Sequence, residues 1–237
     1  MSLSSSGRFS VIVRILAIQM ACLLALAGTP AGAAVLHTFD FSTEPDGDAG
    51  PWLQKSGFQY ELDAKKLEAK FKDRRLVLAT TDNLAGLFIH EANIPNVKSV
   101  RISWGVNLYP DGADWEKGNY RVPIAVVISF GSKKIASGLP FLPDAPYFIS
   151  PFLSRNAVAG RIYTARYFKK GGRYVCNPCA PDAGTLVTTT VDLATIYNSQ
   201  FEPGALPPVT GFSFQMNTKD TRGGASAFLQ KVEFLSD

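Results

Sequence analysis

Apolar and polar residues alternate with a period of two in several short segments of this chain. The clearest of these segments are 67–71, 102–108, 120–130, 187–191 and 212–216. Such alternation is typical of β-strands that bury one face and expose the other. In segment 120–130 the second face also carries Ala125 and Val127, so we expect a central strand that is covered on both sides.

Residues that favour turns separate these segments, at 45–48, 110–112, 169–172, 202–204 and 222–224. The segment 192–201 is the one helix that we expect after residue 33. Many short strands, frequent turns and one short helix predict an all-β fold, an antiparallel β-sandwich of the jelly-roll or galactose-binding-like kind. By analogy with jelly-roll domains, we expect the first strand, 35–41, to pair with the last, 225–234.

The N-terminal residues have the three parts of a secretory signal peptide. Arg8 and Arg14 precede an apolar run at 15–28, and small residues follow at 31–34. We therefore expect a cleaved signal peptide over 1–33, a single β-sandwich domain over 34–237, and a periplasmic or secreted protein. An uncleaved anchor is the alternative, although the run is shorter than the ~20 residues of a spanning helix. We find no second apolar run long enough to span a bilayer.

Charge and cysteine content follow from this leader. The formal charge of +4 falls to +2 without Arg8 and Arg14, which gives no argument for a nucleic-acid partner. Cys176 and Cys179 then remain, in the sequence Cys-Asn-Pro-Cys. A disulfide is the simplest interpretation in an oxidising compartment, and free thiols or a redox or metal role are the alternatives.

Four sequence elements resemble a family of exported bacterial proteins that carry a domain of unknown function (number 3047). They are Ile102–Val106, Gly118–Phe130, the spaced residues Asp192, Tyr197 and Phe201, and the segment Asn217–Thr221 with Ala227–Phe234. The resemblance covers about Val97 to Phe234 and implies a β-sandwich without an established activity.

The chain departs from the family pattern at three of these elements. Val106 stands where the family has a second aromatic residue, Gly118-Asn119 replaces a pair of aspartates, and Asn217 replaces an acid. If those acids hold an ion or a sugar in the family, this chain has altered that site.

Aromatic residues beside acids are candidates for sugar binding, because a ring can stack on a sugar while carboxylates bind its hydroxyls. The clearest example is Trp115, with Asp111, Asp114 and Glu116 around it. Tyr147 lies in the Pro-rich segment 139–152, where we expect a long loop that contains a strand. The ligand-binding candidates are Tyr109, Asp114, Trp115, Arg121, Tyr147, Asn217 and Asp220. An exposed acidic turn is the alternative explanation of the residues around Trp115.

A calcium site is a weaker hypothesis, and we expect no other cofactor. Asp46 and Asp48 share one turn with Glu44 and could take a further ligand from elsewhere, such as Asp220. Turn formation alone also explains these residues.

The chain has no Gly-x-Ser-x-Gly nucleophile motif, and His37 and His90 are explained as structural residues. The sequence therefore favours a module that binds a carbohydrate or cell-envelope polymer, and the basic and aromatic segment 161–174 suits an anionic one. A structural envelope protein and a hydrolase with paired carboxylates are the alternatives. The sequence predicts no oligomeric state.

Overall fold

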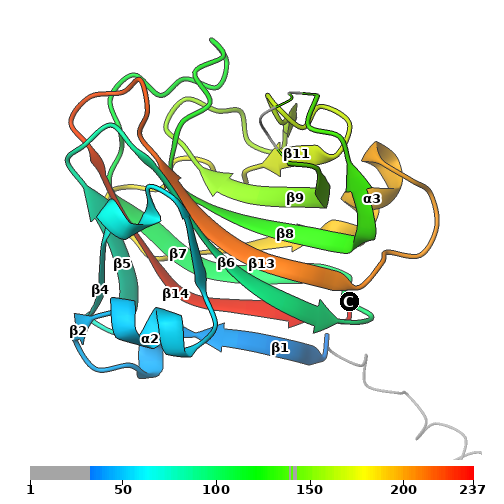
Figure 1. Cartoon of the computed structure of the whole chain (residues 1–237), viewed down its shortest axis with the longest axis horizontal. Coiled ribbons are helices and arrows are strands. Elements are labelled where there is room, and N and C mark those ends of the chain that lie inside the picture. Colours follow the sequence, from blue (N-terminus) through cyan, green and yellow to red (C-terminus); the bar gives the residue numbers. More distant parts are fainter. Residues whose placement is uncertain (1–32, 139, 141–142) are drawn as a thin grey trace, which may run out of the picture. The chain divides into compact units, whose positions relative to one another are not determined.

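The alternating segments form two facing sheets in the computed structural model, which describes residues 33–138, 140 and 143–237 (Figure 1). Apart from Ala33, the expected signal peptide lies outside the described residues. Each sheet has seven strands within the described part of the chain. These sheets confirm the predicted all-β sandwich.

The first sheet, called sheet A, includes both chain-terminal strands of the described part. In spatial order it contains β12 (Val187–Asp192), β7 (Ser99–Leu108), β14 (Ala225–Leu235), β5 (Arg75–Thr80), β4 (Glu68–Lys72) and β2 (Gly47–Asp48), with β1 (Val35–Asp40) also paired to β14. The pairing of β1 with β14 is antiparallel, and Asp40 lies opposite Lys231. This pairing confirms the one expected between the first and last strands.

The second sheet, called sheet B, contains the predicted central strand. In spatial order it contains β10 (Ile162–Thr164), β11 (Gly172–Val175), β9 (Ala145–Leu153), β8 (Val122–Ile135), β13 (Val209–Asn217), β6 (Ala85–Ile94) and β3 (Gln59–Leu62). β9 and β11 pair in parallel, which departs from the antiparallel expectation.

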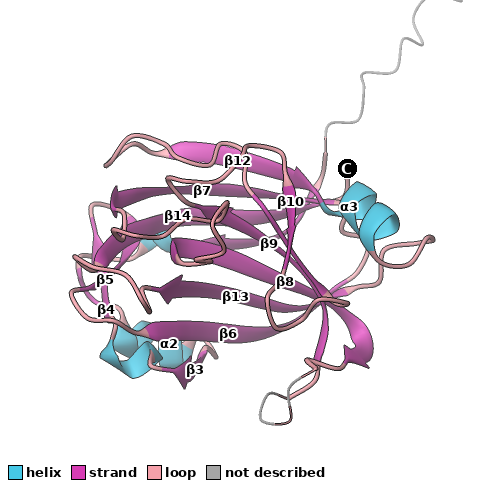
Figure 2. Cartoon of the chain, turned by 90° about the horizontal axis from the view of Figure 1, so that it is seen from above, coloured by secondary structure: helices cyan, strands magenta, loops and turns pink. Residues whose placement is uncertain are grey.

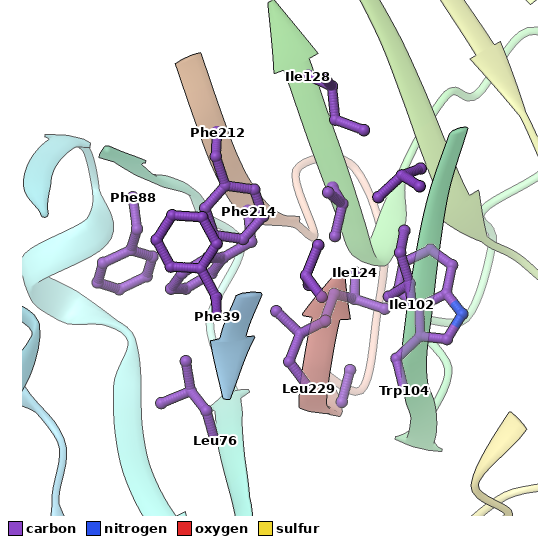
Figure 3. Close-up of a cluster of buried hydrophobic side chains, with 14 of the residues drawn as sticks. Phe39, Leu76, Phe88, Ile102, Trp104, Ile124, Ile128, Phe212, Phe214 and Leu229 are labelled. Atoms are coloured by element: carbon purple, nitrogen blue, oxygen red, sulfur yellow. The ribbon is translucent and has the colours of Figure 1, made fainter. Parts of the chain in front are cut away.

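The inward faces of the two sheets form the core (Figure 3). Ile102 and Trp104 come from β7, whereas Phe212 and Phe214 come from β13, and all four side chains are fully buried. The Trp104 indole also donates a hydrogen bond to Thr189 Oγ1 at 2.9 Å, which satisfies its polar atom. Each such side chain contributes about 1.5–3 kcal/mol through its burial.

Two short α-helices lie at opposite ends of the sandwich (Figure 2). The predicted helix is α3 (Leu193–Gln200), and Asp192 caps it by accepting from the Thr195 amide at 2.8 Å. The sequence analysis missed α2 (Gly50–Lys55), which is too short to display a helical period. Single-turn 3₁₀ helices occur at η1 (Phe41–Thr43) and η2 (Ala64–Lys66). No helix of the described residues is long and apolar enough to cross a membrane.

Candidate functional site

The outer face of sheet B is built by the side chains that alternate with the core residues of its central strands. On β13 these outward residues are Gly211, Ser213 and Gln215, since Phe212 and Phe214 point inward. The strand register places Gln215 beside Ala125 of β8 and Leu87 of β6. The outward rows are therefore small, polar or aliphatic, and they carry no charge at these positions.

Part of this outer face is open to solvent. Val127 and Ser129 of β8 and Gln215 of β13 are only half-buried. Ser213, between Val127 and Ile89 in the register, is buried at the bottom of the face. A ligand lying across β8 and β13 would therefore meet uncharged groups. Glu91, opposite Gly211, is exposed at the β6 side.

Aromatic side chains gather on the outer face at the end of sheet B where β8 begins and β9 ends. We call Trp115, Tyr120, Phe152, Tyr163 and Tyr174 the aromatic platform. The Trp115 ring stacks on Phe152, with centroids 4.0 Å apart, and lies 5.0 Å from Tyr120 and 5.1 Å from Tyr174. Trp115 is 4% exposed, whereas Tyr120 and Tyr174 are half-buried. The two tyrosines thus form the solvent side of the platform.

Tyr174 links the platform to the open part of the face. Its hydroxyl accepts a hydrogen bond from Gln215 Nε2 at 3.3 Å. Burial raises the pKa of Tyr174, and the bond from Gln215 opposes that effect. The hydroxyl therefore stays protonated at neutral pH. Opposite Tyr174 in the register, Ser150 is fully buried, and its hydroxyl has no partner within the described structure.

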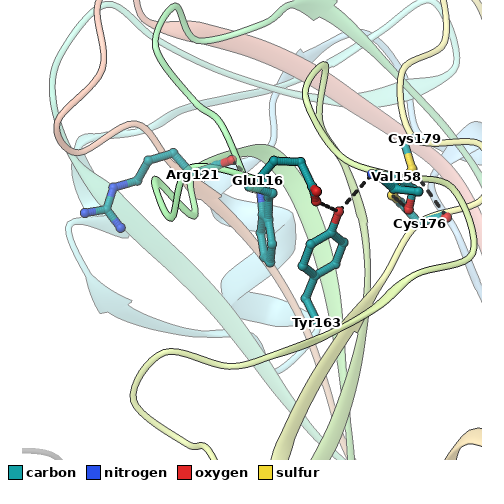
Figure 4. Close-up of a disulfide and its surroundings, with 7 residues drawn as sticks. Glu116, Arg121, Val158, Tyr163, Cys176 and Cys179 are labelled. Carbon is teal, nitrogen blue, oxygen red and sulfur yellow. Dashed lines mark hydrogen bonds between the residues drawn. A yellow bond between two sulfur atoms is a disulfide. The ribbon is translucent and has the colours of Figure 1, made fainter.

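Hydrogen bonds from the loops hold the platform in place. The Trp115 indole donates to the Arg121 carbonyl at 3.0 Å. The Tyr163 hydroxyl donates to Glu116 and accepts from the Val158 amide at 2.8 Å (Figure 4). Tyr163 and then Arg161 lower the pKa of Glu116, so its carboxylate stays charged. Glu116 therefore serves the platform as an anchor.

The predicted disulfide joins Cys176 and Cys179 in the structure, next to the platform (Figure 4). Both cysteines are buried, and they belong to the same apolar cluster as Trp115 and Phe152. Their carbonyls accept from the amides of Gly160 and Ser154, each at 2.8 Å. The disulfide thus closes a turn within the loop after β11, and the two backbone hydrogen bonds join that turn to the loop after β9.

Five of the predicted ligand-binding residues come together at the platform end. Arg121 donates to the Lys219 carbonyl and pairs with the Asp220 carboxylate. Asn217 lies opposite Val122 at the start of β8, and its Oδ1 accepts from the Lys219 amide. Asp114 accepts from the amides of Glu116 and Lys117. These polar groups are therefore engaged mainly in shaping the loops.

Sugar binding by Tyr109, Trp115 and Tyr147 requires exposed rings, and the structure contradicts this expectation because all three are buried. Trp115 forms the buried floor of the platform. Tyr109 is buried and donates to the Pro181 carbonyl at 2.7 Å, and burial raises its pKa to about 12. Tyr147 is also buried, opposite Phe130, at the far end of β8. The eight positions from Val122 to Phe130 correspond to roughly 26 Å, so Tyr147 lies far from the platform.

The acidic candidates do not form a metal site. Asp46 Oδ1 accepts from the Asp73 amide and Asp48 Oδ1 from the Gly50 amide, each at 3.0 Å. Among residues 33–138, 140 and 143–237, no group of three or more His, Cys, Asp or Glu side chains could hold a metal ion. The described residues therefore give the calcium hypothesis no ligand set.

Two carboxylates, those of Glu68 and Asp82, line one groove of about 300 Å³ beside β5. Both residues are exposed, and Glu68 pairs with Lys70. A glycosidase places its two carboxyl groups on either side of the bond that it cleaves. This groove therefore gives little support to the hydrolase alternative.

The sequence analysis did not select Tyr120, Tyr174 or Gln215. Gln215 lies in the alternating segment 212–216, and Tyr174 lies in the basic and aromatic segment 161–174. Aromatic residues that flank a predicted central strand are the signal that could have pointed to this part of the site. In that basic segment, Arg161 pairs with Glu116 and Arg173 donates to Gln200, so these two cations are engaged within the protein.

No family model and no curated protein matches the sequence, so the resemblance to domain number 3047 stays a prediction. Solved structures with a similar arrangement include the exoplasmic/lumenal domain of VIP36 in its Ca²⁺/Man₃GlcNAc-bound form, at 10% identity and a TM-score of 0.40, covering 86% of this chain and 90% of that one. A family 12 xyloglucanase from Bacillus licheniformis aligns at 8% identity and a TM-score of 0.41, over 86% and 98%. The K2 cleaved adhesin domain of Lys-gingipain aligns at 12% identity and 0.35, over 84% and 98%.

Proposed function

We propose that this protein is an exported binding module that holds a neutral glycan on the outer face of sheet B, against the aromatic platform. The observation that carries the proposal is the position of Tyr120 and Tyr174. Both rings are half-buried, both lie on Trp115, and Tyr174 reaches Gln215 on the neighbouring open face.

The chemistry of this surface suits a sugar. A pyranose ring has a face of C–H groups that can pack on an aromatic ring, and hydroxyls at its edge that need hydrogen-bond partners. Tyr120 and Tyr174 offer the rings, while Gln215, Ser129 and the Tyr174 hydroxyl offer both donors and acceptors. The rings are already fixed by packing, so little conformational entropy is lost when a ligand binds.

The lack of charge on the outward faces of β8 and β13 distinguishes between a neutral and an anionic glycan. The outward residues of β8 and β13 between positions 125–129 and 211–215 are uncharged. An anionic polymer would gain no ion pair there, and it would approach the exposed Glu91 at the β6 side. We therefore infer a neutral polysaccharide as the ligand.

Export belongs to the same proposal. The expected signal peptide over 1–33 would deliver the protein to the periplasm or the medium, where such polymers occur. The disulfide supports this location, because disulfides form and persist in oxidising compartments.

A glycan array with the mature protein tests the proposal. We expect neutral oligosaccharides to bind, and Tyr120→Ala to weaken binding about tenfold through the loss of one stacking surface. Leu186→Ala is the matched control, because Leu186 is an exposed apolar residue beside β12 of the other sheet. Equal affinity of Tyr120→Ala and the wild-type protein, or an array without signal, would contradict the proposal.

A further inference from the structure

A concave site lies near α3, at the end of sheet B opposite to the aromatic platform. It is a groove of about 450 Å³ between the distal part of β8 and the segment that joins α3 to β13. Its volume falls in the ~300–1,000 Å³ range of small-molecule sites. The groove contains none of the residues of the aromatic platform.

Aromatic side chains form the floor of this groove. Tyr197 of α3 lies edge-on to Phe130 and Tyr147, with ring centroids 5.6 and 5.7 Å apart. Tyr197 is 3% exposed, yet its hydroxyl makes no hydrogen bond with any other described residue. A hydroxyl without a partner inside the protein can bond to water or to a ligand. The floor thus offers a ring surface together with an unused hydroxyl.

An internal cation occupies the charged side of the groove. The Lys133 ammonium pairs with Glu202 and lies 5.7 Å from the centre of the Tyr147 ring. The Tyr147 hydroxyl donates to the same Glu202 oxygen at 3.0 Å. Carboxylate and aromatic ring together make a site for a protonated amine, and Lys133 already uses it in this way.

This internal contact is weak enough to be replaced. The side chains of Lys133 and Glu202 are 62% and 46% exposed. Exposed ion pairs contribute only about 0–1 kcal/mol, because water screens them and long side chains lose entropy. Lys133 can therefore leave Glu202 at little cost.

We propose that this groove binds an amino sugar, whose ammonium group takes the place of the Lys133 ammonium on Glu202. The sugar ring would pack on the aromatic floor, and its hydroxyls would meet Tyr197, Asn93 and Thr210, which also line the groove. A simple alkylamine would use the carboxylate but leave these hydroxyl and amide groups without a role. An amino sugar carries a ring, hydroxyls and a cation, and the groove offers a partner for each of them.

The charge state of the groove agrees with a cationic ligand. Hydrogen bonds from Lys133 and then from Tyr147 lower the pKa of Glu202, so its carboxylate is charged at neutral pH. When the amine of the ligand replaces Lys133, the same carboxylate keeps an ammonium partner.

Calorimetric titration of the mature protein with glucosamine, glucose and N-acetylglucosamine tests the inference. These probes share a ring, but only glucosamine carries an ammonium group. We expect glucosamine to bind and the two neutral sugars to bind at least tenfold more weakly. Lys133→Met removes the internal competitor, so it should strengthen glucosamine binding by about three- to fivefold. Glu202→Gln should abolish glucosamine binding.

The same titrations contain the outcomes that would overturn the inference. They are equal affinity for glucosamine and glucose, no binding to either the wild-type protein or Lys133→Met, and unchanged binding by Glu202→Gln. Lys133 is exposed and Glu202 is half-buried, and thermal unfolding will verify that each variant is folded. Tyr120→Ala should leave glucosamine binding unchanged, so failure here is distinguishable from failure of the proposed glycan surface.

Discussion

At the scale of single residues, the buried ring of Trp115 contacts the other four rings of the aromatic platform. Its acidic neighbours and nearby glycine are typical of an exposed turn, and a sugar-binding role would also need an accessible ring. The structure buries it because Phe152 and Tyr163, distant in the sequence, pack against its ring. Local sequence cannot reveal such long-range packing. Trp115 consequently supports the tyrosines that are proposed to meet the ligand.

Replacing Trp115 by Ala should reduce the free energy of unfolding by about 3–5 kcal/mol, the usual effect of deleting a buried large aromatic side chain. Urea unfolding followed by circular dichroism measures this loss. Tyr167→Ala is the control, because Tyr167 is an exposed ring, and it should change stability by less than about 0.5 kcal/mol. A loss below about 1 kcal/mol for Trp115→Ala would contradict the buried position.

At the scale of elements, the strands with clear alternation were predicted well. β7, β8, β12 and β13 lie where the two-residue period placed them, and α3 begins after its capping Asp192. The parallel pairing of β9 with β11 was missed, because periodicity reveals which residues share a face but not which strand lies alongside. For the same reason the sequence of segment 161–174 did not indicate that part of it lies beside β9.

The loops on either side of β10 and β11 depend on the disulfide. Replacing Cys176 and Cys179 together by Ala should cost about 2 kcal/mol in the chain-entropy estimate for so short a closed loop. Hydrogen exchange should accelerate within 154–181, where the Ser154 and Gly160 amides bond to the two cysteine carbonyls. Exchange in β12, on the other sheet, should stay as it was. Unchanged exchange in 154–181 would show that the disulfide does not stabilise these loops.

At the scale of the whole molecule, the two proposed binding surfaces lie toward opposite ends of sheet B. The platform lies where β8 begins, and the groove with Glu202 lies beyond Phe130, roughly 26 Å along the same strand. The sequence predicted the sandwich itself, because alternation reports burial directly. It also selected Arg121, Asn217 and Asp220, which meet at the platform end, but it gave no indication that two separate surfaces exist.

The most direct test of the proposed function is an NMR titration of the ¹⁵N-labelled mature protein with a neutral glycan selected on the array. The account predicts amide shifts concentrated at 125–129 of β8, 211–215 of β13 and around Tyr120 and Tyr174. Amides of β12 on sheet A should not respond. Shifts that cluster on sheet A, or a spectrum that does not change at saturating glycan, would contradict binding on the outer face of sheet B.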